Sequence, residues 1–332
     1  MRLDYHIAEL VLRHTFHIAH GASDTRRNVL VRIGDGQGEA APVAYHHESA
    51  EGVVAALEQW RLLIEQLSEP GALHALLGRL EGSAAARAAV DIALHDALGK
   101  RLGCSVSDLL GLRDLPLPPT SFTIAITAPE DLPARVRAAA HYPILKIKLG
   151  AGRDVETVRM IREGAPDARI RVDANAGWAS EQALRLIPQM SELGIELIEQ
   201  PLAVGDVVGL ERLRRAGLGV PIVADESVRS AADVVALAPL VDGVNIKLMK
   251  TGGIAGALAA IHTARSCGLR IMLGCMIETS LGVTAAAHLA PLADWLDIDG
   301  PLLIANDPFV GVTFEGAVPR LPHGPGLGVH AA

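Results

Sequence analysis

Several residue types are scarce in this sequence, and each scarcity argues against a class of protein. The 332 residues include three widely spaced cysteines, which argues against a disulfide framework or zinc knuckle and fits a reducing cytoplasm. No apolar run reaches the roughly 18 residues of a membrane span, and the N-terminus has no signal-peptide core, so neither is expected. Lys and Arg total 30 against 38 Asp and Glu, a formal net charge of −8, so no nucleic-acid surface is expected.

What the chain does contain is globular in composition, with 50% hydrophobic and 20% charged residues. Aromatic residues are only 3%, so the core must consist of Ala, Leu, Val and Ile. The first third is typical of a small α+β unit, with strands expected at residues 4–14 and 28–33 and helices at 51–67 and 83–102. Ser83 is the expected N-cap of the last helix. The proline-rich residues 115–119 form a linker, so we place this first unit at residues 1–117.

From residue 118 a β/α repeat begins, and we assign residues 118–307 to it. Short β-rich runs are expected at residues 121–126, 144–149, 170–173, 195–199, 221–225, 243–248, 270–274 and 295–299. Helical segments separate them, for example residues 154–163, 180–193, 207–216 and 256–267. Eight apolar strands alternating with helices indicate an α/β fold with parallel strands, and eight strands can close a TIM barrel. A doubly wound open sheet is the alternative, but polar residues end most strands, which favours the barrel.

Three acids stand at the ends of consecutive strands, namely Asp173, Glu199 and Asp225. Neighbouring strands lie about 4.8 Å apart, so the three carboxylates can reach one cation. Oxygen ligands without Cys or His favour Mg²⁺. The alternative is that each acid caps a helix or pairs with a lysine.

Lysines flank these acids. Lys146 and Lys148 lie two apart on the second strand and therefore both face the barrel interior. Lys247 lies on the sixth strand, half a barrel away, so Lys148 and Lys247 approach a central ligand from opposite faces. This arrangement predicts removal of an α-proton from a carboxylate substrate by one lysine, with an enediolate stabilised by Mg²⁺. Protonation by the other lysine inverts the centre, whereas loss of a leaving group gives elimination.

These residues resemble the enolase superfamily, in its muconate lactonizing enzyme-like subgroup. The resemblance rests on Lys146-Ile147-Lys148, Asp173-Ala174-Asn175, Glu199-Gln200-Pro201, Asp225-Glu226-Ser227 and Asn245-Ile246-Lys247-Leu248. It implies a modified (β/α)7β barrel with an α+β capping domain, which residues from about 308 to 332 complete. It further implies one Mg²⁺ per subunit on Asp173, Glu199 and Asp225, with Lys148 and Lys247 as the acid/base pair. Lys146 is then expected to steady the metal-bound carboxylate.

The last strand narrows the expected substrate. Asp297-Ile298-Asp299 is similar to the ammonium clamp of dipeptide epimerases, and an extended dipeptide of about 7 Å spans the distance from the metal to these acids. A solvated turn before Gly300 is the alternative. Specificity is expected in the capping loops at residues 14–25 and 43–49. Relatives that act on Ala-Glu are expected to have an arginine in the first loop, where this chain has Ser23 followed by Asp24. This difference argues against Ala-Glu and leaves a small, apolar or cationic side chain open, since Arg26 and Arg27 fall beside the next strand and are expected to point elsewhere. The expected substrate-binding residues are Asp297, Asp299, Thr123, Ser23, Asp24, Met276 and Ile298.

The sequence therefore predicts a Mg²⁺-dependent dipeptide epimerase that inverts the C-terminal α-carbon through a metal-stabilised enediolate. It is expected to be cytoplasmic and homo-oligomeric, with a dipeptide as its partner. An N-acylamino acid racemase, or a cycloisomerase or dehydratase similar to o-succinylbenzoate synthase, remains open, as does a non-catalytic carboxylate-binding barrel.

Overall fold

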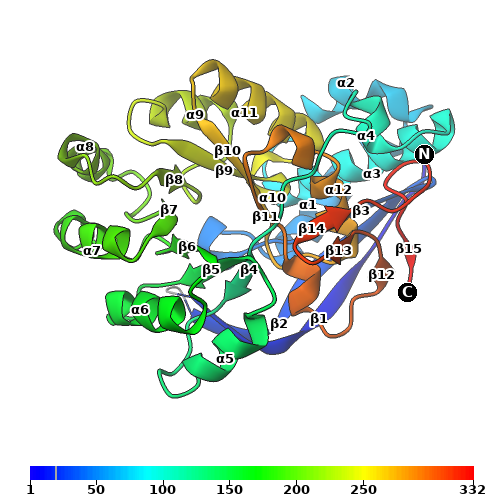
Figure 1. The fold of residues 1–332 in the computed structure, drawn as a ribbon. Helices are drawn as coiled ribbons and strands as arrows, with labels where there is room; N and C mark the ends of the chain where they lie inside the picture. The colour runs from blue at the N-terminus through cyan, green and yellow to red at the C-terminus, as the bar shows by residue number, and fades with distance from the viewer. Residues whose placement is uncertain (19–20) are drawn as a thin grey trace.

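The computed structural model describes residues 1–18 and 21–332 and contains an N-terminal unit beside a barrel (Figure 1). The N-terminal unit has an antiparallel sheet of β1 (Leu3–Ile18), β2 (Gly21–Ile33) and β3 (Gly36–Ala40). Its helices are α1 (Ala50–Glu65), α2 (Leu73–Leu77), α3 (Ala84–Leu102) and α4 (Val106–Leu109), with 3-10 turns η1 (Ala44–His46) and η2 (Pro70–Ala72). The predicted α+β unit is thus present.

Helix α3 packs on this sheet at short range because its facing residues are small. Ser83 caps its N-terminus by accepting a hydrogen bond from the backbone N–H of Ala86 (3.0 Å), as predicted. A Cβ on Gly38 of β3 would lie 2.0 Å from the carbonyl oxygen of Ala89, so only glycine allows this approach.

The first two strands are longer than the sequence predicts. β2 begins at Gly21 rather than at residue 28, and most of its first seven residues are exposed. Polar side chains on both faces of this hairpin hide the alternation that marks a half-buried strand.

The barrel has eight parallel strands in the order β11-β10-β9-β8-β7-β6-β5-β4. They are β4 (Phe122–Ile124), β5 (Ile144–Lys148), β6 (Arg169–Asp173), β7 (Ile195–Glu199), β8 (Ile222–Ala224), β9 (Gly243–Lys247), β10 (Arg270–Gly274) and β11 (Trp295–Asp297). The helices between them are α5 (Leu132–Ala139), α6 (Asp154–Gly164), α7 (Ser180–Glu192), α8 (Val207–Ala216), α9 (Ala231–Leu237), α10 (Leu248–Thr251), α11 (Ile254–Ser266) and α12 (Ser280–Ala287). Two further 3-10 turns are η3 (Ala290–Leu292) and η4 (Gly300–Leu303).

The two ends of this sheet meet, which closes the barrel. The backbone N–H of Ser121, just before β4, donates to the carbonyl oxygen of Leu296 in β11 (3.1 Å). Every strand but the last is followed by helix, and η4 follows β11. The (β/α)7β barrel with its α+β capping unit is therefore confirmed.

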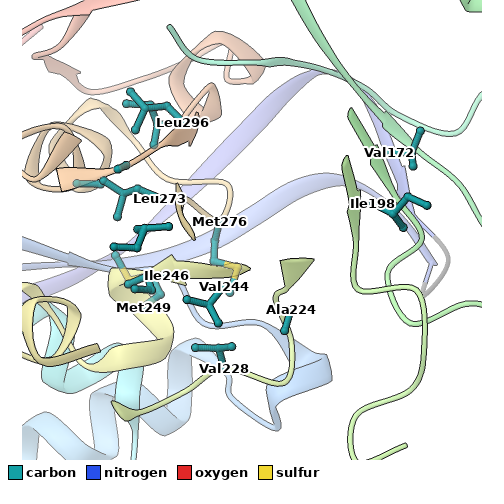
Figure 2. Packing of buried hydrophobic residues seen from close by; sticks show 14 of the residues in the cluster. Val172, Ile198, Ala224, Val228, Val244, Ile246, Met249, Leu273, Met276 and Leu296 are labelled. Atoms are coloured by element: carbon teal, nitrogen blue, oxygen red, sulfur yellow. The ribbon is translucent and has the colours of Figure 1, made fainter. Parts of the chain in front are cut away.

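Side chains alternate between the two faces of the barrel strands. Ile147, Val172 and Ile198 point outward into the main hydrophobic core, and Figure 2 shows part of this packing. The lower interior is filled by a small cluster of buried side chains, Leu197, Val223, Met272 and Trp295. The buried polar residues Arg171 and Asn245 pair in register with Leu197 and Met272 of this cluster, and the acids that end the strands lie beyond it, toward the carboxyl ends. No helix in the described part of the chain is long and apolar enough to cross a membrane.

The C-terminal segment returns to the N-terminal unit. It contains two small ribbons, β12 (Phe309–Val310) paired with β15 (His330–Ala331) and β13 (Thr313–Glu315) paired with β14 (Val318–Arg320). Val106 of α4 donates its N–H to the oxygen of Gly326 (2.8 Å), and Leu327 donates its N–H to Asp96 of α3 (2.8 Å). The same segment also bonds to the barrel, where Thr284 of α12 accepts the N–H of Val312 (2.8 Å). The assignment of residues 308–332 to the capping unit stays a prediction.

Candidate active site

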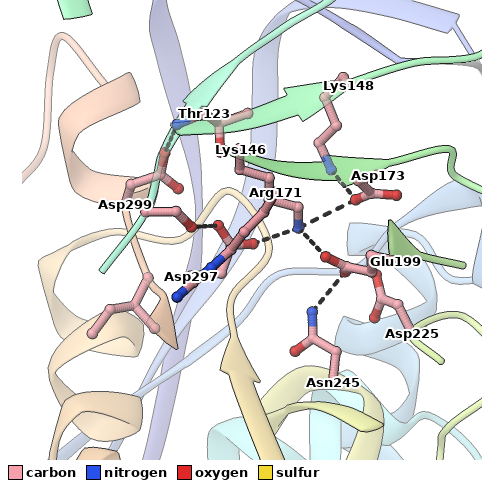
Figure 3. Close-up of polar contacts among 12 residues, drawn as sticks. Thr123, Lys146, Lys148, Arg171, Asp173, Glu199, Asp225, Asn245, Asp297 and Asp299 are labelled. Atoms are coloured by element: carbon pink, nitrogen blue, oxygen red, sulfur yellow. Dashed lines mark hydrogen bonds and ion pairs between the residues drawn. The ribbon is translucent and has the colours of Figure 1, made fainter. Parts of the chain in front are cut away.

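Five polar side chains stand at the carboxyl ends of five consecutive strands, and Figure 3 shows Lys148, Asp173, Glu199 and Asp225 among them. Lys148 ends β5, Asp173 ends β6, Glu199 ends β7, Asp225 follows β8 and Lys247 ends β9. Lys148 is paired in register with Asp173, and Asp173 with Glu199, so these side chains share one level of the barrel. Two amines thus flank three carboxylates.

The three carboxylates form a compact buried group. One oxygen from each of Asp173, Glu199 and Asp225 lies within 4.8 Å of the others. Asn245 donates to Glu199 Oε1 (2.7 Å), and the N–H of Asn175 donates to Asp173 Oδ1 (2.8 Å). An all-oxygen set of this size fits Mg²⁺, which binds a few carboxylates and keeps positions for water and substrate.

Electrostatics in this group favour a bound cation. Burial and the neighbouring charge of Asp173 raise the pKa of Glu199 to about 8. Burial and the charge of Asp225 likewise raise the pKa of the adjacent Glu226 to about 7. Burial and mutual repulsion therefore disfavour full ionisation of these carboxyls, and a divalent cation would relieve this repulsion.

The two flanking lysines approach the triad from opposite sides. Lys148 Nζ lies 2.6 Å from Asp173 Oδ2, and Lys247 Nζ lies 2.8 Å from Asp225 Oδ2. Their strands, β5 and β9, are four positions apart in the eight-strand order. Burial opposes the charge on Lys247, but Asp225 outweighs it and raises the pKa of Lys247. Whatever neutralises Asp225 therefore makes it easier for this amine to release its proton.

Lys146 occupies the centre of the site. Its Nζ lies 2.6 Å from Asp297 Oδ2, 2.7 Å from Glu199 Oε2 and 3.2 Å from Asp173 Oδ2. Burial disfavours its charge, yet these acids together raise the pKa of Lys146 well above its usual value. Lys146 therefore stays protonated and fixes the relative positions of strands β6, β7 and β11.

A fourth lysine belongs to the site although its sequence position gave no sign of a role. Lys250 follows β9 in the one-turn helix α10, where its position outside the strand gives no reason to expect a contact with the site. It is instead buried, and its Nζ lies 2.5 Å from Asp225 Oδ1 and 2.9 Å from the carbonyl oxygen of Asn245. The chain has five lysines, so four of them lie in this barrel mouth.

The two acids at the end of β11 have different surroundings. Asp297 accepts from Lys146 (2.6 Å) and from Ser121 Oγ (2.7 Å), and the Lys146 ammonium, opposing the effect of burial, lowers its pKa to about 2. Asp299 Oδ2 accepts the backbone N–H of Thr123 (2.7 Å). Burial and the charge of Asp297 raise the pKa of Asp299 to about 6. Among the described residues no lysine or arginine pairs with Asp299.

Comparison with known proteins agrees with this geometry. Residues 4–111 match the mandelate racemase / muconate lactonizing enzyme N-terminal domain, and residues 131–332 match the enolase C-terminal domain-like family. The chain belongs to the mandelate racemase / muconate lactonizing enzyme family. The resemblance seen in its strand-end motifs is thereby confirmed.

Several members of this family are similar to the chain over nearly its whole length. An L-Ala-D/L-Glu epimerase from Bacteroides thetaiotaomicron is 39% identical, with 99% of this chain and 88% of that protein covered. The substrate-liganded L-Ala-D/L-Glu epimerase from Bacillus subtilis has a TM-score of 0.93 at 33% identity, covering 100% of this chain and 99% of that one. A dipeptide epimerase from Cytophaga hutchinsonii, complexed with Mg and D-Ala-L-Val, has a TM-score of 0.94 at 27% identity, covering 99% and 95%.

The pocket above the lysines is lined by residues of both the barrel and the capping unit. Thr123 and Met276, two of the expected substrate-binding residues, line it beside Lys146, Lys148 and Lys247. The capping unit contributes Phe16, Arg26, Val43 and Tyr45. Val43 and Tyr45, from the expected specificity loop at residues 43–49, thus line the pocket, and their role in specificity stays a prediction.

Three expected substrate-binding residues lie elsewhere. Ser23 and Asp24 are on the outer part of β2, where Ser23 Oγ donates to the oxygen of Thr25 (2.5 Å) and Asp24 accepts from Thr15 (2.6 Å). The predicted loop is instead part of the β1–β2 ribbon, whose register shifts between Val11 and Phe16, and these two side chains make local contacts there. Ile298 is fully buried in the hydrophobic core, because a residue between two inward-facing acids points outward. Residues 19–20 of the predicted loop lie outside the described part of the chain.

Arg26 is the specificity candidate that sequence reasoning missed. We expected Arg26 and Arg27 to lie beside the strand and away from the substrate. Arg27 does pair with Glu51 at the surface, but Arg26 lines the pocket. Burial lowers its pKa, and no carboxylate in the described chain pairs with it. Consecutive residues of a strand face opposite sides, which separates these neighbours, but no hydrophobic pattern in the sequence shows which of the two faces the pocket.

Proposed function

We propose that this protein is a Mg²⁺-dependent dipeptide epimerase that inverts the α-carbon of the C-terminal residue. The observation that carries the proposal is the pair of amines, Lys148 and Lys247, on opposite sides of a buried carboxylate triad. Inversion requires a proton to leave one face of a carbon and arrive at the other, and two opposed bases serve this need. The named dipeptide epimerases among its relatives support the same assignment.

In this proposal Asp173, Glu199 and Asp225 hold the Mg²⁺ ion, one per subunit. Bound Mg²⁺ supplies Lewis-acid stabilisation of the negative charge that develops on the substrate carboxylate. Lys250 holds Asp225 in place through its 2.5 Å contact, and Asn245 does the same for Glu199. The ligands are therefore positioned before the ion arrives.

The lysines move the proton. A neutral amine, Lys148 or Lys247, takes the proton as the α-C–H bond breaks, and the electron pair is delocalised into the adjacent carboxylate. The opposite ammonium then gives its proton to the other face, forming the new C–H bond. Lys146 adds a permanent positive charge between Glu199, Asp173 and Asp297, which favours negative charge on a substrate held there.

The acids of β11 set the expected substrate class. We propose that Asp299 receives the free ammonium of the dipeptide, because it has no cationic partner in the described chain, while Asp297 orients Lys146. In an N-acylamino acid racemase or a cycloisomerase the substrate has no such ammonium, so an Asp299→Asn variant would then lose little activity. A homo-oligomeric state, a cytoplasmic location and the domain boundaries at residues 117 and 307 stay predictions.

The decisive experiment follows the α-proton by NMR in D₂O with a set of dipeptides. Wild-type enzyme with Mg²⁺ should exchange the C-terminal α-proton of both epimers, and chelation of the metal should stop this. Lys148→Ala and Lys247→Ala should each lose epimerisation about 10²–10⁴-fold, and each should retain exchange with one epimer only. Lys100→Arg, at the remaining lysine, is the matched control and should behave as wild type. If no dipeptide in the set exchanges its α-proton, the proposal is wrong.

A further inference from the structure

A second cavity adjoins the active-site pocket on the side of β4. Its volume is about 390 Å³, within the range of small-molecule sites. Three residues line both cavities, namely Phe16, Thr123 and Leu303. The second cavity is thus a continuation of the active site, between the outer face of β4, helix α5 and strand β1, which lies beside α5 in Figure 1.

The walls of this cavity are apolar. Phe122 and Ile124 face it from β4, and Pro301 and Leu302 from η4. Tyr142 stacks on Phe122, with ring centroids 4.2 Å apart and planes within 5°. A flat apolar wall of this kind suits an aliphatic or aromatic side chain.

The rim of the cavity is positively charged. Arg13, His14 and Arg135 line it, and no Asp or Glu is among its lining residues. Partial burial and the positive charges of Arg135 and Arg13 lower the pKa of His14. A cationic ligand side chain would therefore be repelled.

The position of Asp299 connects this cavity to the substrate. Asp299 Oδ2 is 2.7 Å from the backbone nitrogen of Thr123, and Thr123 forms part of the wall that the two cavities share. In a dipeptide the side chain of the N-terminal residue starts two bonds from the ammonium nitrogen, roughly 2.5 Å away. An ammonium on Asp299 therefore places this side chain at the entrance.

We propose that this cavity binds the side chain of the substrate's N-terminal residue and selects bulky, uncharged side chains over alanine and over lysine. The inference rests on the proposed dipeptide epimerase function, since it uses the ammonium on Asp299 to place the substrate. The methyl group of alanine leaves most of the 390 Å³ unfilled. A leucine or phenylalanine side chain fills more of it and removes apolar surface of both the substrate and the cavity wall from water.

The test compares kcat/KM for dipeptides with Ala, Leu, Phe or Lys at the N-terminus and one fixed C-terminal residue. Wild type should favour Leu and Phe over Ala by about tenfold or more, and Lys should be poorest. Ala138→Phe fills the cavity from the exposed side of α5 and should reduce the preference for Leu and Phe by about tenfold. Ala134→Phe, on the same helix but outside the cavity lining, is the control and should leave the preference unchanged.

A charge reversal gives an independent readout. Arg135→Glu should raise kcat/KM for the N-terminal Lys dipeptide about tenfold relative to Leu, whereas Arg137→Glu, exposed on α5 outside the lining, should not. Equal preference for Ala and Leu in wild type, or ratios unaltered by Ala138→Phe and Arg135→Glu, would overturn the inference. Such a result with normal α-proton exchange leaves the epimerase proposal standing, whereas failure of exchange with all dipeptides overturns both.

Discussion

Replacing Glu278 by glutamine tests how the loop after β10 is held against the capping unit. Glu278 is buried, and its Oε1 accepts the N–H of Met276 (2.7 Å). Its Oε2 lies near the carboxylate of Glu39, and both groups are close to Gly282. A Cβ added to Gly282 would lie 2.6 Å from Glu278 Oε2 and 2.9 Å from Glu39 Oε2. Glu39 accepts hydrogen bonds from Asn28, Thr279 and Gly282, so the proton of this pair belongs on Glu278.

The magnitude follows from the pKa of this carboxyl. Burial and the charge of Glu39 raise the pKa of Glu278 to about 8 from its ordinary 4.5. The folded state therefore binds a proton that the unfolded chain has released between about pH 4.5 and 8. Below pH 4.5 the stabilisation is fully present, and it is lost as pH rises toward 8, at about 1.4 kcal/mol per pH unit and at most about 5 kcal/mol in total. Glutamine has no proton to lose, so Glu278→Gln escapes this loss.

The assay is the difference in melting temperature between variant and wild type, measured by calorimetry in chelator from pH 4.5 to 9. The two proteins should melt at the same temperature near pH 4.5. As pH rises, the free energy of unfolding of the variant should increase relative to wild type, and the difference should reach about 2–5 kcal/mol at pH 9. Glu163→Gln, at an exposed glutamate of α6, should show no such trend. A difference that does not change with pH, or a wild type that is more stable at pH 9, would refute the reasoning.

Three further predictions concern the site itself. Burial and a neighbouring acid raise the pKa of Asp299 to about 6, so its negative charge is lost as pH falls through 6. Below this pH kcat/KM for dipeptides should drop about tenfold per pH unit. If the Asp299→Asn variant shows the same fall in kcat/KM at low pH, this assignment is wrong. Arg26→Met should lower kcat/KM for dipeptides with C-terminal glutamate about 10–100-fold relative to those with C-terminal glutamine, as expected for a lost charge-assisted hydrogen bond. Arg27→Met, at a surface ion pair, is the control. Equal effects of the two variants would count against the role of Arg26. Lys250→Met removes one buried partner of Asp225, which keeps its pair with Lys247. The variant should therefore destabilise the metal-free protein by about 1.5–3 kcal/mol, with weaker Mg²⁺ binding by calorimetric titration. A change well below about 1 kcal/mol would show that this ion pair is dispensable.

The barrel was predictable because its strands are short apolar runs that end in polar residues. All eight expected strands are present, and the residues at their ends converge because parallel strands place their carboxyl ends at one mouth. The order of the strands also fixed the relation between Lys148 and Lys247, since the second and sixth of eight strands face each other. Both features follow from the strand topology, and the spacing of the motifs along the sequence indicates this topology.

The capping unit was less predictable because its contribution depends on which way individual side chains turn. Ser23 and Asp24 were expected at the substrate and lie on the outer hairpin, whereas Arg26 reaches the pocket. A shift of one residue along a strand exchanges its two faces, and a strand with polar residues on both faces gives no hydrophobic pattern to set this register. Lys250 was missed for a related reason, since the one-turn helix that turns it back onto Asp225 has no periodicity to detect.

The concentration of lysine in the barrel mouth has a consequence for observation. Four of the five lysines of the chain surround the acidic triad, and only Lys100 lies elsewhere. Selective ¹⁵N labelling of lysine side chains would therefore yield a spectrum with few signals, nearly all of them from groups within reach of the reacting carbon. Titration with Mg²⁺ and then with a dipeptide would report each amine separately, without assignment of the rest of the molecule.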